Sequence, residues 1–221
     1  MTAPLALGIL AGSAADRLFG DPARAHPVAA FGRAAGKLEG WMWRDRRAAG
    51  AVYAAALVGG TALAASVLER AVRRMPLGRA TFSATVVWAA LGGRSLSREA
   101  LEVAHALAHG DLAEGRRLIP ALVGRDPRSL DGAELARAAV ESVAENTADA
   151  VVGPVLWGAI AGPAGVVAYR AANTLDAMVG HREPRYERFG WAAARLDDLL
   201  TWPAARLAAL LAVALAPLAG G

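Results

Sequence analysis

The sequence predicts an all-α polytopic membrane protein: a helical bundle with a polar helical insertion and a broken, re-entrant helix pair. Hydrophobic residues make up 55% of the 221-residue chain, and Ala-rich apolar runs alternate with Arg-rich loops. Between two of these runs, residues 94–149 are polar and helically periodic. We therefore expect a single integral-membrane domain over 1–221, with segment 94–149 inserted between apolar helices.

The basic charge of the chain is nearly all arginine, and the formal net charge is +4. These arginines lie between apolar runs and do not alternate with aromatic residues, a pattern that favours loops beside membrane helices over a nucleic-acid-binding surface. The expected surroundings are thus a lipid bilayer, with no nucleic acid as partner. The lack of cysteine excludes disulfides, thiolate metal sites and cysteine nucleophiles.

The N-terminal part predicts two short helices. Residues 1–15 are uncharged and lack the basic start of a signal peptide, so we expect a membrane-embedded or interfacial helix. Two prolines predict an extended, turn-rich connection over 20–28. An amphipathic helix is expected over 31–43, where Trp41 and Trp43 beside arginines fit either an interfacial aromatic belt or a packed loop.

Residues 48–68 form the clearest predicted membrane span, because they are uncharged and number about the 20 that a bilayer core requires. A basic turn follows, and the shorter apolar segment 80–93 is expected to return as the second helix of a hairpin. Both segments could instead be buried helices of an Ala-rich soluble bundle. The lack of any polar face in 48–68 favours the membrane.

Three helices are predicted in the polar segment 94–149. A serine is expected to cap the first, which runs to Gly110, and capping-box spacing marks the start of the other two. The capping residues are Ser95 or Ser97, Asp111 with Glu114, and Asp131 with Glu134. His105 and His109 are one turn apart, but no third ligand is near them in the sequence, so a solvated helix face is preferred over a metal site.

Charged residues recur every four positions in the third of these helices and therefore stack on one face. They are Arg137, Glu141, Glu145 and Asp149, and Asn146 lies beside them. Acids at the mouth of the apolar run that follows are suited to hold a cation, a metal-bound phosphate or a proton. The alternative is a solvated helix face with ordinary i,i+4 pairs.

A long uncharged run begins at position 150, and one straight helix over 150–179 would be about 45 Å long, more than a bilayer core requires. The sequence AGPAG at 161–165 interrupts the run near its middle. We predict a re-entrant helix pair with its tip inside the membrane, and the alternative is a single tilted span. A re-entrant pair would bring Asn173, Thr174 and Asp176 back to the face that carries the acids.

The C-terminal part begins with a charged loop over 181–190. A short helix is expected next, which Pro203 interrupts or restarts, and then an apolar tail helix over 207–221. Asp197 and Asp198 would point about 100° apart on a helix, so we do not expect both to ligate one ion.

The chain contains no GxxxxGK[ST] loop, no GxGxxG that opens a helix, no GxSxG and no HExxH. Carboxylates with an asparagine are suited to Mg²⁺, and arginines are suited to phosphate or carboxylate groups. The residues alone therefore predict a polytopic membrane protein with a polar site for an anionic or metal-bound ligand, and they do not define a reaction.

Six collinear motifs cover nearly the whole chain. They are GDPxxxHPV at 20–28, SLSREAL at 95–101, VGRD at 123–126, AVESVAENTADAVVGPVLW at 139–157, AANTLDAMVGH at 171–181 and FGWAAARLDDLLTWPAARL at 189–207. Together they resemble the CobD/CbiB family, the adenosylcobinamide-phosphate synthases of cobalamin biosynthesis.

The resemblance implies a multi-pass enzyme of the bacterial inner membrane. Such an enzyme would be an ATP-dependent acid–amine ligase that uses Mg²⁺. It would join the propionate carboxyl of adenosylcobyric acid, a corrinoid, to aminopropanol O-phosphate or a similar amino alcohol. The alternative function is that of a non-catalytic membrane relative: a corrinoid or amino-phosphate binder, or a small transporter or sensor.

The resemblance also implies roles for the polar residues. Glu141, Glu145 and Asp149, with Asn146, would hold Mg²⁺ and the nucleotide or acyl phosphate, or one acid would deprotonate the incoming ammonium. The implied substrate-binding residues are Arg125, with Asp126 to orient it, and Asn173, Asp176, Asp21, His26, Arg195, Asp197 and Asp198. For each single residue the alternative is a structural role, such as a helix cap or a satisfied buried polar group.

The chain resembles a C-terminally shortened member of this family. Members continue past the PARL helix into a part with an SPNAG-like motif and a Gly-rich segment, and the present sequence ends at Gly221 without them. Either the chain is a shortened homologue or a fragment, or another chain supplies that part, so a homo-oligomer or a partner chain is one expectation.

Overall fold

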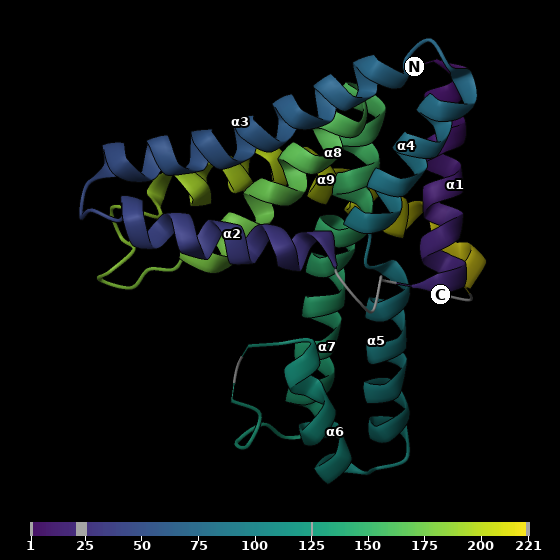
Figure 1. Ribbon diagram of the computed structural model, residues 1–221. Coiled ribbons are helices and arrows are strands. Elements are labelled where there is room, and N and C mark those ends of the chain that lie inside the picture. The colour runs from purple at the N-terminus through teal and green to yellow at the C-terminus, as the bar shows by residue number, and fades with distance from the viewer. Residues whose placement is uncertain (1, 21–25, 125, 220–221) are drawn as a thin grey trace.

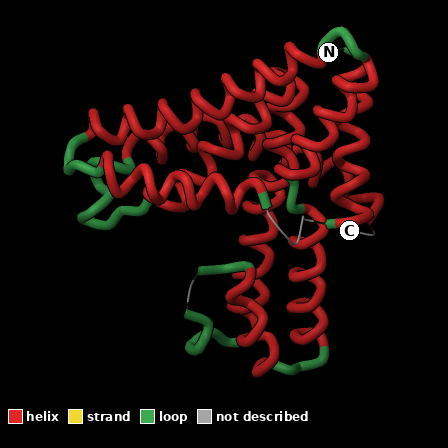
Figure 2. The backbone as a smooth tube through the Cα atoms, viewed as in Figure 1, coloured by secondary structure: helices red, strands yellow, loops and turns green. Residues whose placement is uncertain are grey.

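The computed structural model describes residues 2–20, 26–124 and 126–219, and every regular element within these ranges is helical (Figure 1, Figure 2). The predicted all-α class is confirmed. In chain order the helices are α1 (Ala3–Phe19), α2 (Pro27–Met42), α3 (Arg47–Val72), α4 (Pro76–Ala90), α5 (Gly93–Ala108), α6 (Leu112–Leu118), α7 (Gly132–Thr147), α8 (Gly153–Val179) and α9 (Trp191–Leu215). Short 3-10 turns follow α6 and α9, and a π-helical turn, Ala148–Val152, joins α7 to α8.

Three helical stretches are long and apolar enough to cross a bilayer: Arg47–Val72, Gly132–Val179 and Trp191–Leu218. The first contains the predicted span 48–68. Large apolar side chains on the third, such as Leu210 and Val213, are exposed, as expected for a helix that faces lipid. Together these stretches confirm a helical bundle of the membrane type.

The predicted return helix 80–93 is α4, but it packs mainly against α1 instead of lying along α3 (Figure 1). The reason is a close approach at two glycines of α1. A Cβ atom on Gly8 would lie 2.5 Å from the Cβ of Ser83, and one on Gly12 would lie 2.8 Å from the Cβ of Val87. Small residues at such a contact let two helix backbones come together, which stabilises membrane helix pairs.

A cluster of buried apolar side chains joins α2, α3, α8 and α9. Tyr53 of α3 and Phe189, which precedes α9, are fully buried with ring centroids 5.0 Å apart, next to Leu175 and Val179 of α8. The Tyr53 hydroxyl donates a hydrogen bond of 3.1 Å to the carbonyl of Ala35 in α2. This cluster fixes the C-terminal part of α8 against α3.

The re-entrant helix pair is confirmed. Gly162, inside α8, has φ 66° and ψ −157°, a conformation that essentially only glycine adopts, and Pro163 begins the second arm. The arms then run back along each other, because a Cβ on Gly153 would overlap the ring of Tyr169, and one on Gly158 would lie 3.0 Å from Val166. A single tilted span is thereby excluded, and the depth of the tip in a bilayer stays a prediction.

The polar insertion predicted over 94–149 corresponds to α5, α6 and α7, which lie to one side of the apolar helices (Figure 1). Both predicted acidic caps are present: Asp111 accepts from Glu114 N at 2.9 Å, and Asp131 forms a complete capping box with Glu134. The predicted serine cap is wrong. Helix α5 already begins at Gly93, whose carbonyl accepts a hydrogen bond of 2.8 Å from the Ser97 hydroxyl.

The predicted break at Pro203 is wrong, because α9 is one continuous helix that also includes most of the apolar tail 207–221. Proline removes one backbone donor, which leaves a carbonyl one turn earlier without its usual partner. Side-chain donors from α8 and α9 contact carbonyls beside this point: Trp157 Nε1 lies 2.9 Å from Leu200 O, and Arg206 lies 3.2 Å from Trp202 O. Such local donors allow proline within apolar helices.

The segments around α1 and α2 differ from prediction mainly in length. Helix α1 continues through Asp16, which is 6% exposed, and α2 begins four residues earlier than the predicted start at 31, at Pro27. Trp43 packs in a loop, where its Nε1 donates to Arg185 O at 3.2 Å, whereas Trp41 is 82% exposed. The packed-loop interpretation therefore holds for Trp43, and Trp41 is free to lie at an interface.

Candidate active site

The two arms of the re-entrant pair bring Asp149 and Asn173 together. The Asn173 amide donates a hydrogen bond of 3.3 Å to one carboxylate oxygen of Asp149, and the Tyr169 hydroxyl lies 3.4 Å from the other. The Thr201 hydroxyl of α9 lies 3.2 Å from that of Tyr169. Asp149 belongs to the π-helical turn, an irregularity that is frequent at functional sites. The predicted convergence of distant polar residues is thus present.

Helix α9 adds Asp197 to this group. Its carboxylate is close enough to interact electrostatically with Asp149 and Asp176, and it lies next to Asn173. Within the described residues, one of its two oxygens, Oδ1, is buried and has no hydrogen-bond partner. A buried carboxylate oxygen without a partner is energetically unfavourable, which indicates that this position is suited to bind a ligand.

Asp198 and Arg195 lie at the exposed edge of this group. Their side chains are both 71% exposed and form an ion pair of 3.7 Å with each other. The predicted divergence of the two neighbouring aspartates is confirmed, because Asp197 faces the re-entrant pair and Asp198 is exposed. Asp198 is nevertheless close enough to interact electrostatically with Asp197 and Asp176, so it lies at the edge of the site.

The predicted acid row of α7 lines a small polar pocket. This pocket has a volume of about 330 Å³ and is closed on one side by the connector 122–124. Its polar lining consists of Glu141, Ser142, Glu145, Asn146 and Asp149. Ser142 donates to the carbonyl of Leu122, and the Asn146 amide donates to Ser142 O at 2.9 Å, so these two residues attach the connector to α7.

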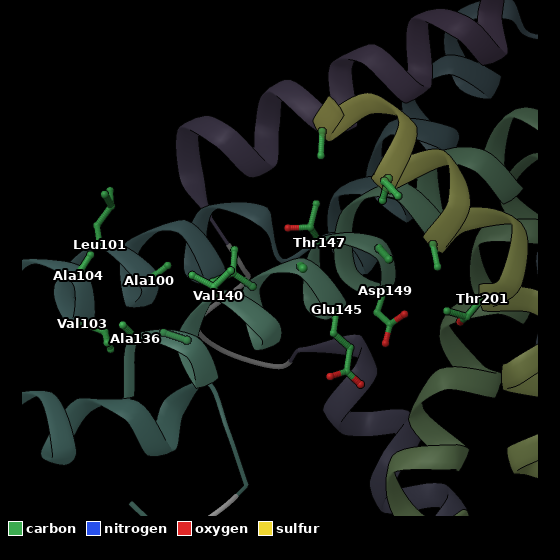
Figure 3. A pocket seen from close by; sticks show the side chains of 18 of the residues that line it. Ala100, Leu101, Val103, Ala104, Ala136, Val140, Glu145, Thr147, Asp149 and Thr201 are labelled. Carbon is green, nitrogen blue, oxygen red and sulfur yellow. The ribbon is translucent and has the colours of Figure 1, made fainter. Parts of the chain in front are cut away.

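A larger, apolar cleft lies on the other side of the acids, between α5, α7 and α9. Its volume is about 930 Å³, and alanines such as Ala104 and Ala208 form much of its wall. Figure 3 shows the carboxylates of Glu145 and Asp149, with Thr201 nearby, on the side of this cleft away from Leu101. Glu145 and Asp149 are the residues that line both the cleft and the polar pocket.

The remaining predicted site residues lie elsewhere. Asp126 is exposed and pairs with Arg128 at 2.7 Å, and hydrogen bonds from the Arg128 side chain and backbone lower the pKa of Asp126. The ring of His26 caps α2 by accepting from Val28 N at 3.2 Å, so the structural alternative holds for this histidine. Arg125 and Asp21 lie outside the described residues.

The predicted magnesium ligands of α7 do not form a group of three close carboxylates in the part of the chain that the structure describes. Within the described ranges, no three or more His, Asp or Glu side chains are grouped closely enough to hold a metal ion, and this includes Glu141, Glu145 and Asp149. Mg²⁺ is, however, often held by one or two carboxylates together with substrate phosphate and water. The Asp149 and Asp197 carboxylates beside Asn173, with the unpartnered Asp197 oxygen, are compatible with that second mode.

Three residues of the site were missed at the sequence level: Tyr169, Arg170 and Thr201. The Arg170 guanidinium donates a hydrogen bond of 3.2 Å to the side-chain Oδ1 of Asn173 and interacts electrostatically with Asp149. It therefore adds a positive charge to the site. Helical spacing could have revealed all three. Tyr169 and Arg170 precede Asn173 by one turn, and Thr201 follows Asp197 by one turn.

Comparison with known proteins identifies relatives of this chain. Residues 9–219 match the CobD/Cbib protein family. The chain is 54% identical over 216 residues to a "Cobalamin biosynthesis protein CobD" of Mycobacterium tuberculosis, an alignment that covers 98% of this chain and 68% of that protein. Proteins with the same name from Stutzerimonas stutzeri and Geobacter metallireducens are 44% and 45% identical, with 92% and 93% of this chain and 67% and 66% of those proteins covered.

The chain thus spans about two thirds of the length of these curated relatives. No solved structure matches it. The match over nearly the whole sequence and the identity to several relatives lead to one conclusion: this chain belongs to the CobD/Cbib protein family.

Proposed function

We propose that this chain forms the amide bond between the propionate carboxyl of adenosylcobyric acid and aminopropanol O-phosphate, giving adenosylcobinamide phosphate in cobalamin biosynthesis. Family membership and the relatives' names support the pathway. The observation that carries the reaction class is the meeting of Asp149, Asn173 and Asp197 beside a polar pocket.

The acids have a clear task in such a reaction. The amine substrate arrives as an ammonium ion, which carboxylates bind through charge-assisted hydrogen bonds. Its nitrogen attacks a carboxyl carbon only after it has lost a proton, so a carboxylate must accept that proton. We assign this role to Asp149, which Asn173 and Tyr169 orient, and we assign ammonium binding to Glu145 on the preceding turn.

Condensation of a carboxylate with an ammonium ion also needs an energy source, and we propose that ATP supplies it. Asp197, whose Oδ1 has no hydrogen-bond partner among the described residues, would hold Mg²⁺ together with substrate phosphate and water, and the ion would neutralise phosphate charge. Arg170 would bind a carboxylate or phosphate group of a substrate through its guanidinium. We further propose that the enzyme resides in the bacterial inner membrane as a multi-pass protein, which the three long apolar helical stretches support.

The test is amide formation by the purified protein in lipid nanodiscs, with adenosylcobyric acid, aminopropanol phosphate and MgATP. The Asp149→Asn variant should lose activity by about 100-fold or more, the usual scale for a general base. Asp45→Asn is a matched control, because Asp45 lies in the loop before α3 and its side chain is 58% exposed. Saturable corrinoid binding without product in the wild type would instead support the non-catalytic alternative.

A further inference from the structure

The apolar cleft and the polar pocket meet at two residues. Glu145 and Asp149 line both cavities, whereas each of the other lining residues belongs to only one of these two. The cavities differ in size and chemistry: about 930 Å³ with a mostly apolar wall against about 330 Å³ with carboxylate, amide and hydroxyl groups. Two unlike cavities that share a pair of acids are suited to two unlike substrates that react where the cavities join.

We infer that these cavities are separate substrate subsites, an inference that rests on the proposed function. The apolar cleft between α5, α7 and α9 binds the corrin macrocycle, and the polar pocket beside α7 binds the ammonium end of the amino alcohol. The reacting carboxyl and amine then meet at Glu145 and Asp149. One bond forms between the amine nitrogen and the carboxyl carbon. ATP would first phosphorylate the substrate carboxyl, giving an acyl phosphate and ADP. When the amine attacks, the bond from the carboxyl carbon to the phosphorylated oxygen breaks and that oxygen leaves in inorganic phosphate. The ammonium ion gives one proton to a carboxylate before the attack, and its nitrogen loses a second proton as the amide forms.

Size supports the assignment of the cleft. A three-carbon amino alcohol would fill little of 930 Å³, which lies near the upper end of the volumes found for small-molecule pockets. The alanines of the wall come from three different helices, α5, α7 and α9, and their short side chains leave a broad apolar surface. The corrinoid is by far the larger of the two substrates, so the larger cavity matches it better than it matches a small, charged amino alcohol.

Charge supports the assignment of the pocket. Glu141 and Asn146 line the pocket but not the cleft, so they add polar groups on that side alone. A cation is attracted to this group of carboxylates, and the ammonium is the cationic part of the amine substrate. The helix α7 therefore separates a side suited to an apolar ring from a side suited to a positive charge.

The assignment predicts that a change in each cavity alters the Michaelis constant of one substrate only. Ala208→Trp places a large ring in the cleft and should raise KM for adenosylcobyric acid by about tenfold or more, with KM for aminopropanol phosphate unchanged. Glu141→Gln should raise KM for aminopropanol phosphate alone. Ala214→Trp is the matched control on α9, because Ala214 is exposed and outside the cleft wall. Ala104→Trp repeats the test from α5 if Ala208→Trp does not fold.

The affinity for adenosylcobyric acid alone, measured by equilibrium dialysis of the protein in nanodiscs, separates this inference from the proposed function. Loss of corrinoid binding in Ala208→Trp but not in Ala214→Trp supports the subsite. Equal binding in wild type and Ala208→Trp overturns the subsite and leaves the proposed function intact. Failure of the wild type to bind the corrinoid at all overturns both. A change of oligomeric state in Ala208→Trp, with corrinoid binding retained, would identify the cleft as a protein-docking surface and overturn the inference.

Discussion

The Asn173 amide donates to the Asp149 carboxylate at 3.3 Å, although the two residues are 24 positions apart and lie on opposite arms of the re-entrant pair. This contact exists because the chain reverses at Gly162, so that positions at similar distances from the turn face each other. The arms thereby hold an acid and an amide at fixed positions, which is a property that a catalytic group requires.

Replacement of Asn173 tests the role of this contact. Asn173→Asp keeps the side-chain shape but places a third negative charge beside Asp149 and Asp197, so we expect a loss of kcat of about tenfold or more from about 1.4 kcal/mol of lost orientation and added repulsion. Asn173→Leu should lose at least as much. Steady-state kinetics with both substrates saturating measures the effect, and unchanged kcat in both variants would exclude a positioning role for Asn173.

The Tyr169 hydroxyl links Asp149 to Thr201, and its removal should affect catalysis more than folding. The ring of Tyr169 is fully buried against Gly153, and Tyr169→Phe preserves that packing. We expect kcat to fall by about tenfold, the equivalent of one hydrogen bond of roughly 1–1.5 kcal/mol, with the melting temperature nearly unchanged. Thr201→Val is a companion variant with a smaller expected loss, because Thr201 contacts Asp149 only through Tyr169. A large drop in melting temperature would instead indicate a structural role.

Much of this arrangement could be predicted from local sequence signals. The Gly–Pro interruption near 162 predicted the chain reversal, because glycine tolerates a positive φ and proline favours the first turn of a new helix. The structure has this arrangement, with φ 66° at Gly162. The acid caps at Asp111 and Asp131 were equally readable, since their spacing is set by one helical turn. These features depend only on residues close together in the chain.

Other features depend on residues far apart in the chain, and local signals did not reveal them. Proline at 203 predicted a break, yet α9 continues through it as one helix. The apolar cleft also depends on how α5, α7 and α9 pack, and the polar pocket depends on how the connector 122–124 packs against α7, which no local pattern encodes.

The reversal at Gly162 should be intolerant of a side chain. Gly162→Ala forces alanine into a region of φ and ψ that it rarely adopts, so we expect a destabilisation of about 1–3 kcal/mol and a lower melting temperature in detergent. Gly59→Ala is the control: Gly59 lies inside α3 and no atom of its surroundings comes within 4 Å of the place that an added methyl group would take, so stability should be equal or slightly higher. Equal melting temperatures for both variants would contradict a special role for Gly162.

An ion pair next to the tip of the re-entrant pair should stabilise the fold. Glu69 of α3 and Arg79 of α4 form a contact of 2.7 Å with both side chains mostly buried, and a Cβ on Gly162 would lie 3.4 Å from Glu69. Glu69→Gln leaves the guanidinium without its charge partner, and breaking a buried pair in this way costs about 3–5 kcal/mol at most, with less expected at this partly exposed site. Thermal unfolding in detergent measures the loss.

The double variant Glu69→Leu with Arg79→Leu separates the two explanations for that loss. Replacing both charges by apolar side chains leaves no unpaired charge, so its melting temperature should lie above that of Glu69→Gln and close to that of the wild type. If the double variant is the less stable of the two, the charges themselves hold the tip, through contacts that leucine cannot replace. The order of the melting temperatures therefore shows what the ion pair does. Either its two charges mainly neutralise each other beside the chain reversal, or they stabilise the conformation of the reversal itself.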